Sequence, residues 1–370
     1  MTGRKKCVVA MAPYERPWSN VELVKDCGLI PYLLYKNHNC EVHMVGAKGI
    51  DYSYKELIQG VSLDFLENGK NETKMAYIKE HAREIDLLLL RGCYVSNFGV
   101  ASVYKQENPK GKIYVGLDAN SFWMDKVDWR QGRLAEFLDC CDVIATSGKE
   151  VQNYLNQKWP WKISYVPNGY YVFSGKRKPP VYAEKENVIL TVGRLGTTQK
   201  ATHVLLEAFA MISEKVPEWK LRLVGTIEDS FQSYIEEYFK KYPQLQNRVD
   251  FAGAILDREA LFEEYRNAKI FAMTSEIEGG TPNVIAEALN GGCVVAVTAI
   301  DGAVDATDYE KCGEISDIDD PVAFAKNLLE LIEGERLQEF SDYAYEYGRT
   351  HFDMENIVAK IYERLWGRNS

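Results

Sequence analysis

Short runs of apolar residues, most of them closed by a polar residue, Gly or Pro, recur along the whole chain. In the first half they cover residues 7–13, 41–46, 85–90, 112–118, 142–147 and 163–169. In the second half they cover residues 188–192, 221–225, 248–253, 270–275 and 293–298. Runs of this length predict parallel strands whose carboxyl ends carry functional loops.

Helical patterns lie between these strands, at residues 29–35, 202–212, 257–268 and 282–290. The alternation predicts an α/β fold, with a doubly wound domain clearest in the second half. The 370 residues are enough for two domains, which we place at 1–175 and 186–350. Between them, residues 174–187 are polar with two prolines and predict a linker. The tail from Pro321 is predicted to be helical.

The composition is that of an ordinary globular protein, with 46% apolar and 26% charged residues. No apolar run approaches the length needed to cross a bilayer, and the start of the chain lacks the cleavage site of a signal peptide. None of the eight cysteines forms a C-x-x-C pair, which favours free thiols in a reducing compartment. We therefore expect a cytoplasmic protein.

The net charge of −10 argues against a nucleic-acid partner. Residues 1–185 hold 26 Lys+Arg and 21 Asp+Glu, net +5, which leaves 18 and 33, net −15, for residues 186–370. A basic first half could meet the inner face of an anionic membrane or a phosphorylated acceptor. Alternatively, the cluster Lys176, Arg177 and Lys178 in the linker supplies most of the excess.

The most informative segment is 274–292, TSEIEGGTPNVIAEALNGG, in which Glu278 and Glu287 flank a Gly-Gly-Thr-Pro turn. Pro282 is placed as the first residue of a helix, with Thr281 as its cap. The backbone amides in the first turn of this helix would then be free to bind a phosphate. They are those of Asn283, Val284 and Ile285. Glu287, on an otherwise apolar stretch, is suited to the vicinal hydroxyls of a ribose. The segment therefore predicts a nucleotide-sugar site.

This segment resembles the Glu-x7-Glu signature of retaining glycosyltransferases of GT-B fold, glycosyltransferase family 4 (group 1) in particular. Residues 188–209, with Gly193, Arg194 and Lys200, resemble the phosphate segment of the same family. Residues 141–172 resemble the stretch that closes its first domain, and residues 25–46 resemble its glycine-marked first helix. The four segments occur in the family's order.

The resemblance implies two doubly wound, Rossmann-like parallel-sheet domains that face a cleft. The first domain would bind the acceptor and the second the nucleoside diphosphate-sugar, and the last helix, at about 353–370, would pack back on the first. The implied enzyme is a retaining hexosyltransferase, with a UDP- or GDP-sugar as donor and a glycan or lipid-linked glycan as acceptor. A role in bacterial surface polysaccharide synthesis is expected at the level of the family.

Residue roles follow from the same resemblance. Arg194 and Lys200 would neutralise the departing diphosphate, and Glu278 would contact the transferred sugar. Asp118 and Asn120, at a strand end, would contact the donor sugar or the acceptor, and Gly28 would let the first helix approach the donor phosphates. The donor site as a whole is predicted at Gly193, Arg194, Lys200, Gly279, Gly280, Thr281, Asn283, Val284, Ile285 and Glu287.

The chain departs from the family pattern at three points. Eight residues, not seven, separate Glu278 from Glu287, and we expect Gly279 and Gly280 to absorb the extra residue. The family's histidine near the transferred sugar is missing, and the strand ends offer Arg91 and Asp118 instead. Ala201 stands where the family usually has Gly.

Alternatives stay open for several of these residues. Arg194 and Lys200 could be surface charges of a solvated loop, Glu278 a surface acid, and Asp118 with Asn120 an Asx-turn. Asp317 and Asp319 form an Asp-x-Asp, which we interpret as the solvated start of a helix rather than a metal site. No cofactor or metal is expected.

Other functions remain possible on the same fold. The rival functions are a sugar-nucleotide epimerase, a phosphorylase, for which no pyridoxal lysine site is found, and a homologue that binds a nucleotide-sugar without turnover.

Overall fold

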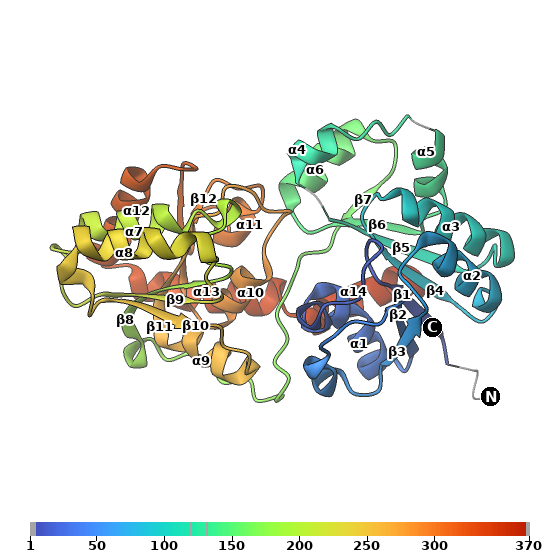
Figure 1. The fold of residues 1–370 in the computed structure, drawn as a ribbon, viewed down its shortest axis with the longest axis horizontal. Coiled ribbons are helices and arrows are strands. Elements are labelled where there is room, and N and C mark those ends of the chain that lie inside the picture. The colour runs from blue at the N-terminus through green and yellow to red at the C-terminus, as the bar shows by residue number, and fades with distance from the viewer. Residues whose placement is uncertain (1–4, 119, 131, 368–370) are drawn as a thin grey trace. The chain divides into compact units, whose positions relative to one another are not determined.

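The computed structural model describes residues 5–118, 120–130 and 132–367. Its chain divides into two compact units, Met1–Tyr171 with Met354–Ser370, and Val172–Asp353. Each unit is built on one parallel sheet, and both are drawn in Figure 1.

The first unit has a seven-stranded sheet in the order β3-β2-β1-β4-β5-β6-β7, with every neighbouring pair parallel. The strands are β1 Cys7–Met11, β2 Glu41–Ala47, β3 Ser62–Leu66, β4 Leu87–Arg91, β5 Lys112–Leu117, β6 Val143–Thr146 and β7 Ile163–Tyr165. The central strands are apolar along their length and buried, as a sheet covered on both faces requires.

The helices of this unit connect successive strands, apart from the last one, which returns from the second unit. They are α1 Asp26–His38, α2 Asn71–His81, α3 Val95–Glu107, α4 Ser121–Asp125, α5 Gly132–Asp139, α6 Lys149–Lys158 and the C-terminal α14 Met354–Trp366, with short 3₁₀ helices η1 Asn20–Val24 and η2 Ser53–Ile58. Helix α14 packs on α1, and the rings of His38 and Tyr362 stack at 4.2 Å between centroids. Figure 1 shows the red last helix beside the blue first one.

The second unit has a six-stranded parallel sheet in the order β10-β9-β8-β11-β12-β13. The strands are β8 Glu186–Val192, β9 Lys220–Val224, β10 Val249–Gly253, β11 Ala268–Met273, β12 Val294–Thr298 and β13 Gly313–Ser316. The helices are α7 Thr202–Ile212, α8 Gln232–Lys241, α9 Arg258–Asn267, α10 Asn283–Asn290, α11 Ala303–Thr307, α12 Pro321–Glu333 and α13 Leu337–His351. Short 3₁₀ helices are η3 Tyr182–Glu184, η4 Thr198–Lys200, η5 Asp229–Phe231 and η6 Pro243–Leu245.

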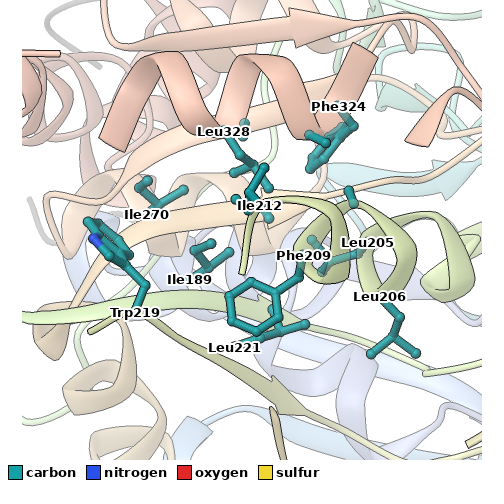
Figure 2. Close-up of a cluster of buried hydrophobic side chains, with 14 of the residues drawn as sticks. Ile189, Leu205, Leu206, Phe209, Ile212, Trp219, Leu221, Ile270, Phe324 and Leu328 are labelled. Atoms are coloured by element: carbon teal, nitrogen blue, oxygen red, sulfur yellow. The ribbon is translucent and has the colours of Figure 1, made fainter. Parts of the chain in front are cut away.

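The core of the second unit lies between its sheet and the helix pair α7 and α12. Figure 2 shows Phe209 of α7 and Phe324 of α12 among the strand residues Ile189, Leu221 and Ile270. All five side chains are fully buried. This packing fixes the carboxyl ends of β8 and β11, from which the loops of the candidate site leave the sheet.

Both sheets have the strand order 3-2-1-4-5-6 of a doubly wound fold, extended by one strand in the first unit. The winding reverses between β1 and β4 in the first unit and between β8 and β11 in the second. Ligands of such sheets bind at the carboxyl ends of the strands at this switch point. The α/β fold predicted from the sequence is therefore confirmed, and it indicates where in each unit a site should be sought.

Within the described residues, no helix is both long and apolar enough to cross a membrane. The eight cysteines, all among the described residues, form no disulfide, and Cys40, Cys293 and Cys312 are fully buried. Burial raises the pKa of the Cys293 thiol to about 11, so it stays protonated and behaves as a small apolar side chain.

Candidate functional site

The loop that follows β8 carries the two predicted phosphate-binding cations. Gly193 and Arg194 leave the strand directly, and Lys200 ends the short η4 turn, which Thr197 caps through its side chain. Ala201 then adopts a left-handed conformation, with φ 41°. Glycine takes this conformation without the clash of a Cβ, which explains why the resembling family has Gly at this position.

Lys200 forms an ion pair with Glu278, which lies on the loop after β11. The two side chains are 19% and 11% exposed. Because β8 and β11 are neighbours in the sheet, loops that are far apart in sequence meet at this point. The structure thus brings Lys200 of the predicted cation pair together with Glu278, which was predicted from a separate segment.

Gln199 joins these residues and was not singled out from the sequence. Its side-chain oxygen accepts a hydrogen bond from Arg194 at 2.9 Å, and its side-chain nitrogen donates to the carbonyl of Ile277 at 3.0 Å and to Glu278 at 3.4 Å. Its backbone carbonyl accepts from the amide of Glu276 at 2.9 Å. Three of these contacts, those with Glu276, Ile277 and Glu278, hold the phosphate loop against the glutamate loop.

Between the two glutamates, Gly280 has a φ of 118°, which only glycine adopts readily. A Cβ on the facing Gly302 would lie 2.4 Å from the carbonyl oxygen of Gly280, so the two turns touch through their backbones. That glycine absorbs the insertion stays a prediction, with which the positive φ of Gly280 is compatible.

The start of the following helix differs from the sequence prediction. Helix α10 begins at Asn283, and Pro282 is its N-cap, with φ −65° and ψ 149°. Thr281 is not a cap, because its buried hydroxyl is turned towards Asp305 at 3.5 Å. The amide of Ile285 is not free either, since it donates to the carbonyl of Pro282 at 3.0 Å. The proline ring fixes φ but leaves ψ extended, which delays the helix by one residue.

Glu287 is buried on α10, with 6% of the residue exposed. One carboxylate oxygen forms an ion pair with Arg258 at the start of α9, and the other accepts a hydrogen bond from the Tyr265 hydroxyl at 2.9 Å. Burial, together with the negative charge of Glu287, raises the pKa of Tyr265, which keeps this hydroxyl a donor. The partners that a buried acid requires thus come from α9.

In the first unit, Arg91 at the end of β4 lies between two carboxylates. It forms an ion pair with Asp26 of α1 and another with Asp118 at the end of β5, at 3.0 Å. Burial alone would lower the pKa of Arg91, but the charges of Asp26 and Asp118 raise it well above the usual value. Arg91 is therefore a permanent cation.

A small cavity of about 30 Å³ lies beside Arg91 and Asp118. The hydroxyl of Thr146, at the end of β6, lines this cavity and has no hydrogen-bond partner among the described residues, although Thr146 is only 2% exposed. A buried hydroxyl without a partner costs free energy unless a ligand or water completes it.

Two other predicted residues of this unit have local structural roles. The side-chain oxygen of Asn120 accepts a hydrogen bond from the amide of Trp123 at 3.0 Å and caps α4. A Cβ on Gly28 would lie 2.3 Å from the carbonyl oxygen of Leu23, so this glycine lets α1 pack against η1. Contacts of either residue with a substrate stay predictions.

The Asp-x-Asp motif precedes helix α12, whose N-cap is the next residue, Asp320. Asp319 lies 3.5 Å from a ring nitrogen of His203. Over residues 5–118, 120–130 and 132–367, no group of three or more His, Cys, Asp or Glu side chains is arranged to hold a metal ion.

Comparison with known proteins identifies the second unit. Residues 186–334 match the family described as Glycosyl transferases group 1. No curated protein matches the chain in sequence. Residues 186–334 form a group 1 glycosyltransferase domain.

Solved structures show the fold of the whole chain. HepE of Anabaena, in complex with UDP, is 18% identical with a TM-score of 0.73, over 97% of this chain and 99% of its own. Sucrose-phosphate synthase of Thermosynechococcus elongatus is 19% identical with a TM-score of 0.72, over 97% and 98%. A glycosyltransferase of Rickettsia africae is 15% identical with a TM-score of 0.72, over the full length of both chains. The fold is GT-B, as the resemblance implied.

Within the group 1 glycosyltransferase domain, the residues missed from the sequence are the partners of predicted ones. Gln199 lies in the phosphate segment, directly before Lys200, and its position was a signal that could have been used. Arg258 and Tyr265 follow the predicted helix start at Asp257, but nothing in their spacing points to Glu287, which is 29 and 22 residues away.

Proposed function

We propose that the protein transfers a hexose from a nucleoside diphosphate-sugar to an acceptor hydroxyl, with retention of the anomeric configuration. The observation that carries this proposal is the cluster of Arg194, Gln199, Lys200 and Glu278 at the switch point of the group 1 domain. It combines two cations suited to a diphosphate with a carboxylate suited to sugar hydroxyls.

The donor diphosphate would bind between the phosphate loop and the first turn of α10. The amides of Asn283 and Val284 open this helix, where the helix dipole favours an anion. Lys200 has a flexible four-carbon stem, which allows its ammonium to turn from Glu278 to a phosphate oxygen. Glu278 would then be released for the hydroxyls of the transferred sugar.

The donor ribose would bind at Glu287. Each carboxylate oxygen has two lone pairs, and Arg258 and Tyr265 use one on each oxygen. The remaining lone pairs can accept two ribose hydroxyls, while Arg258 offsets the buried charge. HepE has been solved with UDP, with UDP and glucose, and with UDP-glucose, which makes a UDP-sugar the first donor to test.

The acceptor hydroxyl is assigned to the first unit, at Asp118 and the unpaired hydroxyl of Thr146. The comparison structures include TarM of S. aureus in complex with fondaparinux, α-GlcNAc-glycerol and UDP, and WaaB, a lipopolysaccharide outer core galactosyltransferase. We extend these acceptor classes to this chain as a glycan or lipid-linked glycan, in bacterial surface polysaccharide synthesis.

Retention would follow from attack on the face that the diphosphate leaves. The new bond joins the acceptor oxygen to the anomeric carbon, the bond to the diphosphate oxygen breaks, and the acceptor proton passes to that diphosphate oxygen. Asp26 and Asp118 are both ion-paired with Arg91, which makes either a poor displacement nucleophile. The enzyme's part is charge stabilisation and positioning.

A thermal-shift screen with UDP, GDP, ADP and their sugars tests donor binding, since a ligand of the folded state raises its apparent stability. The proposal expects a shift with UDP and a UDP-hexose, then transfer to a glycan acceptor with an unchanged anomeric configuration by NMR. Binding without hydrolysis or transfer would favour a non-catalytic homologue. Conversion of the donor to its epimer would favour an epimerase, and no shift with any nucleotide would contradict the proposed site.

A further inference from the structure

A second cavity of the first unit adjoins the one beside Thr146. Its volume is about 50 Å³, and Arg91 and Tyr114 line both cavities, so the two lie side by side across β4 and β5. Trp18, from the loop after β1, and residues of α1 line the second cavity, which we call the Trp18 cavity. No residue role assigned so far uses it.

The Trp18 cavity exists because two of the sheet residues that line it are small. Ala10 of β1, Leu89 of β4 and Tyr114 of β5 are partners in register, so their side chains share one face of the sheet. Arg91 and Gly116 form the next pair on the same face. Ala10 carries only a methyl group and Gly116 has no side chain, which leaves space between the sheet and α1.

The residues around the Trp18 cavity supply one hydrogen-bond donor and one acceptor. Trp18 is 4% exposed, and its indole N–H has no acceptor within the described part of the chain. Pro31 lies inside α1 and has no N–H, so the helical hydrogen bond from residue 31 to the carbonyl of Cys27 is not formed. Both Cys27 and Pro31 line the cavity. Buried polar groups of this kind are normally completed by a ligand or by water.

The rest of the wall is mostly apolar, with Met11, Ile30 and Leu89 among its residues. One water-sized group needs roughly 10–15 Å³. The cavity, at about 50 Å³, therefore has room for a few non-hydrogen atoms, such as those of an acetyl group, but not for a sugar ring. The Arg91 side chain is 25% exposed, so a substituent can enter from solvent where the two cavities meet.

We propose that the Trp18 cavity binds the acetamido group of an N-acetylated amino sugar in the acceptor. The carbonyl oxygen of this group would accept a hydrogen bond from the indole N–H of Trp18, and its N–H would donate to the carbonyl of Cys27. Its methyl group would lie against the apolar wall. A 6-deoxy sugar has the methyl group without the polar groups, and a hydroxyl has no methyl group. The acetamido group uses the donor, the acceptor and the apolar wall together.

The inference rests on the proposed function, because it specifies the acceptor of the proposed transfer. The adjoining cavity is lined by Asp118 and Thr146, to which the acceptor hydroxyl is assigned. An acetamido group in the Trp18 cavity would anchor the sugar ring beside these two residues. Trp18 would thus determine which acceptor is used without contacting the reacting atoms.

Titration of the full chain with simple sugars, followed by saturation-transfer NMR with and without UDP, tests the proposal. The probes are the methyl glycosides of glucose, N-acetylglucosamine, 6-deoxyglucose and N-butanoylglucosamine, together with the galactose and N-acetylgalactosamine pair. Each N-acetylated sugar should bind about tenfold more tightly than its hydroxyl counterpart, through the added hydrogen bonds and the buried methyl group. The N-butanoyl sugar should lose this gain, because its longer chain exceeds the cavity.

Two variants change the cavity in different ways. Trp18→Phe keeps an aromatic ring but removes the N–H, and should lower the preference for the N-acetylated sugar by about fivefold. Ala10→Val fills part of the cavity with two further methyl groups and should abolish the preference. Trp159→Phe, at a buried tryptophan of the same unit that lines neither cavity, is the control and should keep it. A thermal melt of each variant, together with its UDP-induced shift, verifies the fold and the donor site.

Failure of this inference and failure of the proposed function give different results. Equal affinity for N-acetylated and hydroxyl sugars would overturn the inference, as would a preference that persists in both Trp18→Phe and Ala10→Val. Tighter binding of the 6-deoxy sugar than of the N-acetylated one would also overturn it, because the cavity would then serve a methyl group alone. In each case a thermal shift with UDP would leave the proposed function standing. Absence of that shift in the wild type would contradict the proposed function instead.

Discussion

Lys200 and Glu278 form an ion pair that ties the loop after β8 to the loop after β11. The pair stands where the winding of the sheet reverses, so it marks the ligand edge of the group 1 domain. Gln199 links this pair to Arg194 through hydrogen bonds to Arg194 and to Glu278. A bound diphosphate can replace the Glu278 carboxylate as the partner of the Lys200 ammonium.

The first prediction concerns the two cations. Arg194→Ala or Lys200→Ala should lower kcat/KM by about 10²-fold or more, because each removes a charge-assisted contact to the leaving diphosphate. Steady-state rates with the donor identified by thermal shift provide the measurement. Lys215→Ala, an exposed lysine of the same unit, is the control. Wild-type turnover in both site variants would show that these are ordinary surface charges.

A second prediction concerns Gln199, which positions its neighbours without being assigned a contact to the reacting atoms. Gln199→Met keeps the size of the side chain but removes its bonds to Arg194, Ile277 and Glu278. We expect kcat to fall by about tenfold, the equivalent of one lost charge-assisted hydrogen bond, with a smaller change in KM.

The variant Gln199→Glu distinguishes the contact of this side chain with Arg194 from its contacts with Ile277 and Glu278. It keeps an acceptor for Arg194 but places a negative charge beside Glu278, so it should lower kcat at least as far as Gln199→Met does. Gln232→Met, at an exposed position on α8, is the matched control. Rescue of activity by Gln199→Glu would mean that only the contact to Arg194 matters.

The sequence predicted the parts of the site that depend on strand order. The loops after the first and fourth strands of a doubly wound sheet must meet. In the second unit these strands are β8 and β11, and their loops bring Arg194 and Lys200 close to Glu278. It did not predict the partners of Glu287, because Arg258 and Tyr265 reach it from another helix through side-chain directions that spacing does not encode. The requirement for such partners was nevertheless visible, since an acid on an apolar helix face needs them.

The helices of the first unit were harder to predict than its strands. Of the helices between its strands only residues 29–35 were recognised, whereas α1 runs from Asp26 to His38 with Gly28 and Pro31 inside it. Glycine and proline in a sequence usually indicate the end of a helix. Here Gly28 lies inside the helix because α1 packs closely against the backbone of Leu23. At 282–290 the helix was predicted correctly but its cap was not, because φ of proline suits both the N-cap and the first turn.

A third prediction concerns pH. Lys74 is buried on α2 and donates to the carbonyls of Ala12, at 2.7 Å, and Tyr14. Burial lowers its pKa from 10.5 to about 8. Between these values the unfolded chain holds a proton that the folded chain has released, so stability should rise with pH through this window. Below about pH 8 both states are protonated and the cost of burying the charge is present in full.

The variant Lys74→Met should remove that rise, which is limited to about 1.4 kcal/mol per pH unit. Urea unfolding at about pH 7.5 and about pH 9.5 gives the free energy of unfolding of the wild type and of the variant at each pH. The change between the two pH values is then compared between the two proteins. Lys79→Met, an exposed lysine of the same helix, should leave the pH dependence as in the wild type. A pH dependence of Lys74→Met identical to that of the wild type would contradict the assignment.

Metal removal gives a fourth prediction. Activity should survive EDTA, because Arg194, Lys200 and the first turn of α10 supply the positive charge that the diphosphate requires. The measurement is the initial rate before and after chelation, with magnesium or manganese then added back. Complete loss with EDTA, restored by either ion, would contradict this prediction and direct attention to Asp317 and Asp319.

The last prediction sets the two glutamates against each other. Glu287 is proposed to hold the ribose and Glu278 the transferred sugar. Glu287→Gln keeps an acceptor for Tyr265 but loses the charge, and is preferable to Glu287→Ala because a buried Arg258 left without a partner costs about 3–5 kcal/mol. It should weaken the binding of UDP and of UDP-sugar alike, by about 1.5–3 kcal/mol.

Glu278→Gln should leave UDP binding unchanged or tighter, since it releases Lys200 for the phosphates, and should lower kcat instead. Calorimetric titration of both variants with UDP, beside steady-state rates, gives the comparison. An equal loss of UDP affinity in the two variants would mean that the inserted residue has turned Glu278 away from the sugar, so that its carboxylate serves the nucleotide through Lys200.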